Sequence, residues 1–287
     1  VETKKENLEI KDRRSEIAMA EEFSFGGEIV WRPSAEVMAH SRLQQFMNRH
    51  GLRTLAELQQ RSTDDIAWFW DAVLTELGIE FYTPYRQVVD VSRGIQWPAW
   101  CVDGVMNIVH NCLDKWQSTA TVNRAALRWE GEEGQTRVLT YGDLYREVNR
   151  LAEGLRALGL GKGDAIGLFL PMIPEVVIAL LAIAKIGGVI LPLFSGYGAG
   201  AVASRLADGE AKALFTADGF WRRGRVAPLK AVADEALLQA PSVQHVIVVA
   251  RAQNDIAWSS GRDHWWQDVV AGQPTRALTE RTRAEDM

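Results

Sequence analysis

The feature that most constrains the fold is an alternation of strand-length and helix-length apolar segments between Asp164 and Arg225. The expected strands are 165–170, 189–193 and 213–216, and the expected helices between them are 174–186 and 199–208. This alternation is typical of parallel strands joined by crossover helices. The sequence therefore predicts an α/β fold with a mostly parallel sheet.

Two segments with the potential to bind a ligand directly follow expected strands. A glycine loop at 194–200 follows the second strand, and a basic turn at 222–225 follows the third. Parallel sheets bind ligands in crevices beyond the carboxyl ends of their strands. We therefore expect both segments at the ligand-binding edge of the sheet.

The glycine loop has the sequence FSGYGAG, which begins with Phe194, Ser195 and Gly196. Glycines at this position let backbone amides approach a phosphate, helped by the N-terminus of the following helix. The spacing G-x-G-x-G is not the dinucleotide fingerprint G-x-G-x-x-G, and no Gly-Lys-Ser/Thr of a phosphate loop is present. An ordinary tight turn and a ligand-contacting loop therefore both remain open.

The basic turn consists of Arg222, Arg223, Gly224 and Arg225, with no acidic residue between them. The guanidinium group binds phosphate bidentately and keeps its charge at any working pH. Three arginines on one turn are suited to a multiply phosphorylated ligand. The alternative is a turn that is simply solvated.

A length of 287 residues makes two structural units the first expectation. Residues 1–28 are strongly charged and are expected to form a flexible arm. Residues 29–116 are expected to be a helical N-terminal extension, with one helix from Ser34 through Met47 and another from about Ser62 to Leu77. Residues 117–287 are expected to be the α/β subdomain, entered through a β-hairpin around Gly131–Gly134. No element is expected in the polar segment 279–287.

The composition limits which binding partners and which cellular compartment are expected. A net charge of −5 gives no reason to expect nucleic acid or an anionic membrane as a partner. The apolar stretch 176–194 contains Lys185, two glycines and a proline, so it is better split into a buried helix and a buried strand than taken as a membrane span. Cys101 and Cys112 are expected to be buried free thiols in a cytoplasmic protein, and the five histidines show no metal-binding spacing.

Taken in order along the chain, several segments resemble the acetyl-CoA synthetase branch of the adenylate-forming (AMP-binding) acyl-CoA synthetases. The similarity covers roughly Trp31 to Val270. The segments that carry it are FYTPY at 81–85, WCVDG at 100–104, MNIVHNCLDKW at 106–116, LTYGDL at 139–144, AIAKIGGVILPLF at 182–194, TAD at 216–218 and RRGR at 222–225. None is decisive alone, but the ordered series is specific.

The resemblance implies an acid–thiol ligase that works in two steps. A short carboxylic acid attacks ATP to give an acyl-adenylate and pyrophosphate, and coenzyme A then displaces AMP. Magnesium would offset the charge of the triphosphate. By resemblance, Arg222 and Arg225 would contact the phosphates or adenine of coenzyme A, Arg223 and Gly224 would shape the turn, and Phe194-Ser195-Gly196 would line the adjacent wall, where the family tends to have Phe-Gly-Gly.

The resemblance also implies what this chain does not contain. The family's Ser/Thr/Gly-rich phosphate loop would follow a segment like 283–287, and the remaining ATP, magnesium and acyl-pocket residues would come later still. The chain is therefore expected to be an N-terminal portion whose partner is the missing C-terminal part of the same protein. No catalytic or metal-binding residue is assigned, and the chain alone is predicted not to form acyl-adenylate. Acetate, propionate and acetoacetate all remain possible acids.

Two other classes of function remain open. One is a non-catalytic α/β module that scaffolds or binds a partner protein. The other is a dinucleotide-dependent oxidoreductase that uses the glycines at 196–200. The second is disfavoured because the acidic residue expected at the end of the next strand comes only at Asp218, in the following loop.

Overall fold

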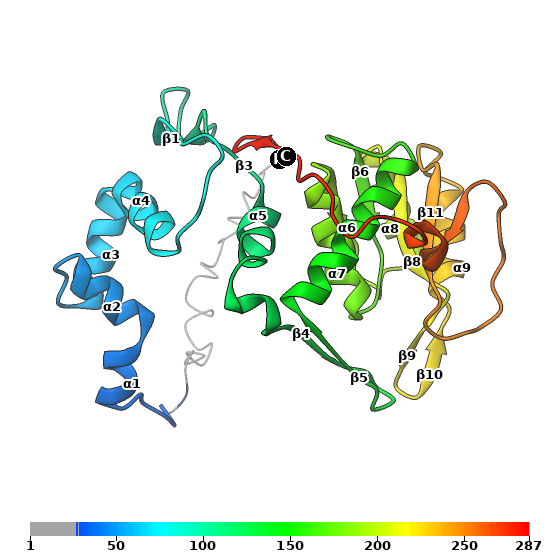
Figure 1. The fold of residues 1–287 in the computed structure, drawn as a ribbon, viewed down its shortest axis with the longest axis horizontal. Coiled ribbons are helices and arrows are strands. Elements are labelled where there is room, and N and C mark those ends of the chain that lie inside the picture. The colour runs from blue at the N-terminus through cyan, green and yellow to red at the C-terminus, as the bar shows by residue number, and fades with distance from the viewer. Residues whose placement is uncertain (1–26, 28, 287) are drawn as a thin grey trace, which may run out of the picture. The chain divides into compact units, whose positions relative to one another are not determined.

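The computed structural model describes residue 27 and residues 29–286 of the chain (Figure 1). The chain divides into two compact units, of which the first ends at Ile66 and the second runs from Ala67 to the C-terminus. The flexible arm expected at 1–28 lies outside the described residues apart from Gly27. The separation of 29–116 from 117–287 stays a prediction.

The first unit is helical, as expected, but its helices are shorter than the sequence suggested. They are α1 (Ala35–His40), α2 (Arg42–Arg49) and α3 (Leu55–Asp64). The single helix expected from Ser34 to Met47 is interrupted at Ser41, which has an extended backbone. The hydroxyl of Ser41 accepts a hydrogen bond from the Gln44 amide, so this residue ends one helix and caps the next.

The helix expected to start near Ser62 begins later. Ser62 and Thr63 belong to the end of α3, and Asp65 separates it from α4 (Ile66–Glu76). Gly78, at φ +60°, follows α4 and takes the left-handed conformation common just beyond a helix end.

Short elements connect α4 to the main sheet. They are β1 (Gln87–Asp90), β2 (Ala99–Val102), β3 (Val105–Met106), α5 (Ile108–Cys112), η1 (Asp114–Trp116) and η2 (Ala120–Asn123). The segment between α4 and α5 contains a hairpin, since β1 and β2 pair antiparallel. The expectation that no element forms after Thr279 was wrong, because β13 (Thr282–Arg283) pairs antiparallel with β3.

The expected hairpin lies at the entrance to the α/β region, and a capped helix follows it. β4 (Ala125–Glu130) pairs antiparallel with β5 (Thr136–Thr140), and α6 (Tyr141–Ala157) follows. Thr140 accepts a hydrogen bond from the Asp143 amide at 3.1 Å, and the Asp143 carboxylate accepts from the Thr140 amide at 3.0 Å. This reciprocal capping box fixes the first turn of α6.

The main sheet has five parallel strands. They are β6 (Ala165–Leu168), β7 (Val189–Pro192), β8 (Ala213–Ala217), β11 (His245–Val249) and β12 (Asp263–Trp265). The spatial order is β12-β11-β8-β6-β7, with every neighbouring pair parallel. The predicted α/β fold is confirmed, and all five residues of β8 are buried, as expected for a central strand.

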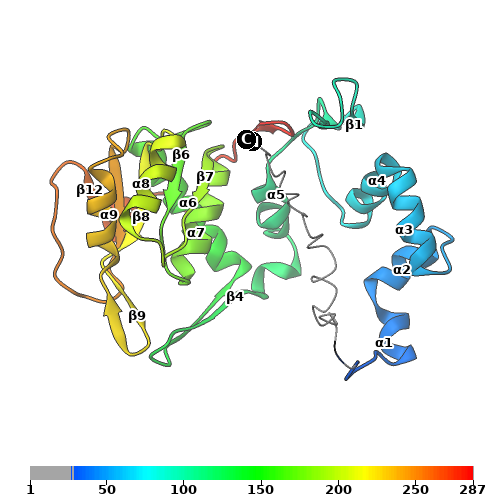
Figure 2. The ribbon, with the colours of Figure 1, turned by 180° about the vertical axis from the view of Figure 1, so that it is seen from behind.

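Crossover helices pack around this sheet in two groups, as Figures 1 and 2 allow the reader to follow. The crossover helices are α7 (Pro174–Lys185), α8 (Ala199–Asp208) and α9 (Leu229–Leu237), and α10 (Trp266–Val270) follows the edge strand β12. α6 packs against α7 and α10, whereas α8 packs against α9. Right-handed crossovers place α7 on one face of the sheet and α8 with α9 on the other. One hydrophobic core includes buried side chains from both groups.

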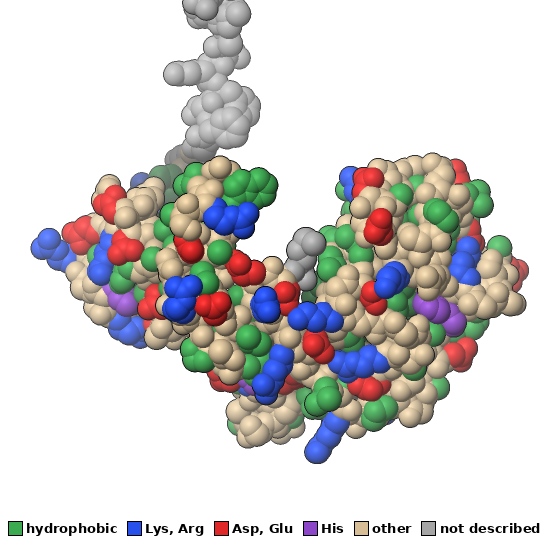
Figure 3. All heavy atoms as spheres, turned by 90° about the horizontal axis from the view of Figure 1, so that it is seen from above, with side chains coloured by type: hydrophobic (Ala, Val, Ile, Leu, Met, Phe, Trp, Pro, Cys, Tyr) green, Lys and Arg blue, Asp and Glu red, His purple; other side chains and the backbone are tan. Residues whose placement is uncertain are grey.

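The structure also tests the expectations about the membrane span and the cysteines. Among the described residues no helix is long and apolar enough to cross a membrane, and 176–194 forms α7 and β7. The cysteines are free, but the expectation that both are buried was wrong, since Cys101 is half-buried and Cys112 is exposed. Acidic and basic side chains are interspersed on the face shown in Figure 3.

Candidate functional site at the carboxyl edge of the sheet

The strand order creates a switch point between β6 and β8. The chain passes from β6 to β7 on one side and then returns past β6 to β8 on the other. Loops that leave neighbouring strands in opposite directions open a crevice at the carboxyl edge, where ligands of such folds bind. The same strand order, 2-1-3-4-5 along the sheet, is a common doubly wound arrangement.

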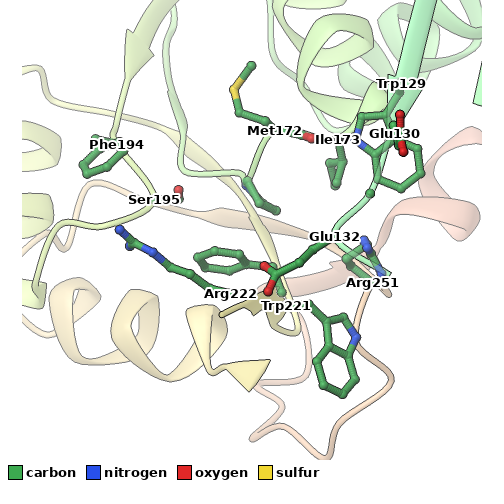
Figure 4. Close-up of a pocket in the computed structure, with 13 residues that line it drawn as sticks. Trp129, Glu130, Glu132, Met172, Ile173, Phe194, Ser195, Trp221, Arg222 and Arg251 are labelled. Atoms are coloured by element: carbon green, nitrogen blue, oxygen red, sulfur yellow. Dashed lines mark hydrogen bonds between the residues drawn. The ribbon is translucent and has the colours of Figure 1, made fainter. Parts of the chain in front are cut away.

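A cavity of about 300 Å³ lies at this edge (Figure 4). Segments that follow four of the five strands contribute to it, together with the tip of the β4–β5 hairpin. The lining residues are Trp129, Glu130, Gly131, Glu132, Pro171, Met172, Ile173, Phe194, Ser195, Phe220, Trp221, Arg222 and Arg251. Its wall therefore combines aromatic side chains with two arginines and two glutamates.

The basic turn is the tip of a two-residue β-hairpin. β9 (Phe220–Arg222) pairs antiparallel with β10 (Arg225–Ala227), so Arg222 and Arg225 are direct cross-strand partners. Arg223 and Gly224 have φ of 53° and 70°, the positive values that the favoured hairpin turn requires. The sequence predicted a turn here, and the structure adds that paired residues present Arg222 and Arg225 on the same face.

The structure brings only some of the predicted site residues to the cavity. Phe194, Ser195 and Arg222 line it together, and in Figure 4 the Arg222 side chain extends toward the other two. Arg223, Gly224 and Arg225 lie on the hairpin beyond the lining residues. Gly196 also does not line the cavity.

Gly196 lies in close contact with the Phe194 ring of its own loop. A β-carbon there would lie 2.5 Å from Cε1 of Phe194, closer than real contacts allow. Phe194 in turn packs edge-to-face on Tyr197, with ring centroids 5.6 Å apart, and Arg205 lies over the Tyr197 ring. The glycine thus leaves room for the Phe194 ring, which lines the cavity although Gly196 does not.

Buried Asp218 joins the ends of β8 and β11. Its Oδ1 accepts hydrogen bonds from the amides of Gly219, Arg251 and Ala252, and its Oδ2 accepts from the Gln253 amide at 2.6 Å. These bonds fix the backbone that carries Arg251 into the cavity. Because the carboxylate is committed to backbone amides, it is poorly placed to bind a ribose hydroxyl as an oxidoreductase would require.

Arg251 is a cavity residue that sequence reasoning missed. Its side chain is 13% exposed and makes a bidentate contact with Glu133, at 2.9 and 2.6 Å, while its guanidinium lies over the Trp129 ring. This contact holds the pKa of the Glu133 carboxyl below its usual range. The buried Nε of Arg251 has no hydrogen-bond partner in the described part of the chain.

Trp129 was also missed as a site residue. Its indole Nε1 donates to the carbonyl of Met172 at 2.7 Å, which ties the β4–β5 hairpin to the loop after β6. Gly131 makes this arrangement possible, because a β-carbon there would lie 2.8 Å from the Trp129 ring. The hairpin was predictable from the sequence, but no local signal places its tip against loops that follow in the chain.

No metal centre emerges from the described residues. Within residues 27 and 29–286, no group of three or more His, Cys, Asp and Glu side chains could hold a metal ion.

A second cavity of about 410 Å³ adjoins the first and shares Trp129, Ile173 and Arg251 with it.

The chain matches two protein families in sequence. Residues 114–286 match the family described as AMP-binding enzyme, and residues 55–112 match the family described as acetyl-coenzyme A synthetase N-terminus. The two matches follow one another along the chain and together include every residue of the cavity.

Individual proteins give the same result. The acetyl-coenzyme A synthetase of Methanothrix thermoacetophila is 38% identical over 87% of this chain and 38% of its own length. That of Mycobacterium tuberculosis is 44% identical over 75% of this chain and 33% of its own length. Among solved structures, acetoacetyl-CoA synthetase from Streptomyces lividans superimposes with a TM-score of 0.78 at 28% identity, covering 88% of this chain and 39% of the other. The chain thus spans less than two fifths of the length of each of these relatives.

Proposed function

The chain belongs to the AMP-binding enzymes, in the branch of the acetyl-coenzyme A synthetases, and on this basis we propose that it is the N-terminal part of a short-chain acyl-CoA synthetase. The complete enzyme would convert a short carboxylic acid, ATP and coenzyme A into acyl-CoA, AMP and pyrophosphate through an acyl-adenylate. The acid, ATP and coenzyme A are its proposed partners, in the cytoplasm. The chain alone would not form the adenylate.

The observation that supports this proposal most is the position of the arginine hairpin at the switch point of the sheet. Arg222 and Arg225 are cross-strand partners at the carboxyl edge, beside a cavity lined by Phe194 and Ser195. We assign the hairpin to the phosphate-bearing nucleotide end of coenzyme A. The aromatic wall, which includes Trp129 and Phe220, suits the less polar part of that ligand.

In this assignment the described residues bind and orient coenzyme A, and take no part in the bond changes. Arg222 and Arg225 would offer charged hydrogen bonds to phosphate oxygens. Arg223 and Gly224 would hold the turn in the conformation that pairs them. Magnesium would accompany ATP in the complete enzyme, and no described residue is assigned to it, because no suitable cluster of ligands is present among residues 27 and 29–286.

A double substitution in the complete enzyme tests the assignment. Arg222→Ala with Arg225→Ala is expected to raise the KM for coenzyme A by at least about tenfold, since a hydrogen bond to a charged group is worth about 1.5–3 kcal/mol. The acid-dependent exchange of pyrophosphate into ATP, which requires no coenzyme A, should keep its rate. The two half-reactions are thereby separated within one variant.

Arg93→Ala is the matched control, because Arg93 is exposed on the loop between β1 and β2 and lines neither cavity described above. An unchanged KM for coenzyme A in the double variant would refute the binding role of the hairpin. If the complete enzyme showed no acid-dependent exchange at all, the ligase proposal itself would fail and a non-catalytic module would be favoured.

A further inference from the structure

Across the part of the chain that the structure describes, the three arginine side chains of the hairpin make no ion pair through their guanidinium groups. Arg222, Arg223 and Arg225 are all exposed, and no ion pair or hydrogen bond to their guanidinium groups occurs within the described residues. Three like charges on four consecutive residues repel one another. The hairpin therefore favours any anion that reaches it.

One anionic group of the chain already contacts this hairpin. The Glu132 carboxylate accepts a hydrogen bond of 2.7 Å from the amide of Gly224, at the centre of the turn. The two residues are 92 positions apart in sequence, so the contact joins the tip of the β4–β5 hairpin to the tip of the β9–β10 hairpin. A turn amide flanked by arginines is the kind of donor that phosphate oxygens also take.

The backbone on both sides of Glu132 is anchored by contacts of neighbouring residues. Glu133, the next residue, is held by the bidentate contact with Arg251, and Trp129 is held by its bond to the Met172 carbonyl. Figure 4 shows the Glu132 side chain reaching into the cavity between Arg222 and Arg251. A phosphate bound at the Gly224 amide would therefore meet the Glu132 carboxylate.

We propose that Glu132 is a built-in counter-ion of the coenzyme site, which an incoming phosphate group must displace from the Gly224 amide. Without ligand the carboxylate offsets part of the hairpin's charge and occupies its central amide. With ligand the same carboxylate opposes binding, so Glu132 lowers the affinity of the site for anions. The inference rests on the proposed coenzyme site for the identity of the natural ligand.

The contrasting role is purely structural, in which Glu132 only positions the hairpin. The two roles predict opposite effects of Glu132→Gln. Glutamine keeps a carbonyl oxygen that can accept from Gly224 but carries no charge, so the position of the hairpin is preserved. The counter-ion role predicts tighter anion binding, and the structural role predicts equal or weaker binding.

The test is calorimetric titration of the 287-residue chain and its Glu132→Gln variant with coenzyme A and, separately, with inorganic pyrophosphate. The affinity of the variant is expected to be about three- to tenfold higher for both probes at low salt, because the substitution removes a like charge that repels the bound phosphate. The gain should shrink at about 0.5 M salt, where screening shortens the range of the interaction. Glu235→Gln, an exposed glutamate on α9, makes the same change in net charge and should leave both affinities unaltered.

The outcomes separate this inference from the proposed function. If coenzyme A binds through Arg222 and Arg225 but Glu132→Gln gives no gain, the counter-ion role is wrong and the coenzyme site stands. If pyrophosphate binding shows the gain but coenzyme A does not bind, the counter-ion role stands and the assignment of the ligand fails. If neither probe binds either chain, the inference is overturned, because no anion then reaches the hairpin.

Discussion

At the scale of the residue, Lys185 is a buried charge outside the cavity. This side chain is 1% exposed, and its ammonium contacts both oxygens of Asp114, at 2.9 and 3.0 Å, and the hydroxyl of Thr279 at 2.6 Å. Burial lowers the pKa of Lys185, and the bond to Asp114 opposes that shift. The three residues join α7, η1 and the C-terminal segment around one buried charge.

Removing the Asp114 carboxylate should lower the free energy of unfolding more than removing the Lys185 ammonium. Asp114→Ala leaves a buried ammonium without its counter-ion, which costs about 3–5 kcal/mol in comparable pairs. Lys185→Met removes the buried charge and leaves a carboxylate that is 18% exposed to water, so we expect a smaller loss. Urea unfolding of the two variants at pH 7 measures the difference.

Each variant is the control for the other, since each removes one half of the same pair. If Asp114→Ala lowers the free energy of unfolding by less than about 1 kcal/mol, the range of exposed ion pairs, then the pair is hydrated and contributes little to stability. No local pattern indicates this pair, because Asp114 and Lys185 are 71 residues apart and Lys185 lies in a largely apolar helix.

At the scale of the element, the helix boundaries were predicted best where a specific residue type marks the end of a helix. Pro174 begins α7 as expected, and α8 has the expected bounds of 199 and 208. Failures occurred where one residue type supports two structures. Ser41 fits a continuous helix by its spacing, but its hydroxyl caps a new helix instead.

Short paired strands escaped the sequence for a different reason. β13 has two residues and pairs with β3, about 176 positions earlier, as the bond from Thr282 to the Met106 carbonyl illustrates. Two residues carry no periodicity, and pairing at such separation depends on the rest of the fold. The same argument applies to Trp129 and Arg251 in the cavity, which non-local contacts bring together.

The capping box of α6 provides a test at this scale. Thr140→Ala removes the hydroxyl that accepts from the Asp143 amide, and we expect a loss of about 1 kcal/mol in the free energy of unfolding. Thr140→Ser keeps the hydroxyl and should retain most of the stability. Urea titration monitored by circular dichroism measures both.

The pH dependence offers an independent check of the same cap. The hydrogen bonds from the side chain and amide of Thr140 lower the pKa of Asp143 from its ordinary 3.8. A carboxyl whose pKa is lower in the folded state contributes stability that is complete above its unfolded pKa and is lost as the pH falls through its folded pKa. The difference in free energy of unfolding between the parent and Thr140→Ala should therefore become smaller below pH 3.8. A difference that does not change with pH would argue against the charged cap.

At the scale of the whole molecule, the parallel sheet supplies the frame and non-local contacts complete the site. The strand order places the loops after β6, β7, β8 and β11 at one edge, and the β4–β5 hairpin tip reaches the same place. The sequence predicted the edge and its arginines, because both follow from the order of strands and loops. It did not predict the opposite wall, which a segment far earlier in the chain provides.

The central claim is that the arginine hairpin binds the phosphate-bearing end of coenzyme A. The most direct measurement is calorimetric titration of the 287-residue chain with coenzyme A, beside the variant that carries both Arg222→Ala and Arg225→Ala. We predict measurable binding by the parent that weakens with added salt, and a loss of at least about tenfold in the variant. Binding of equal affinity by the two chains would contradict the claim.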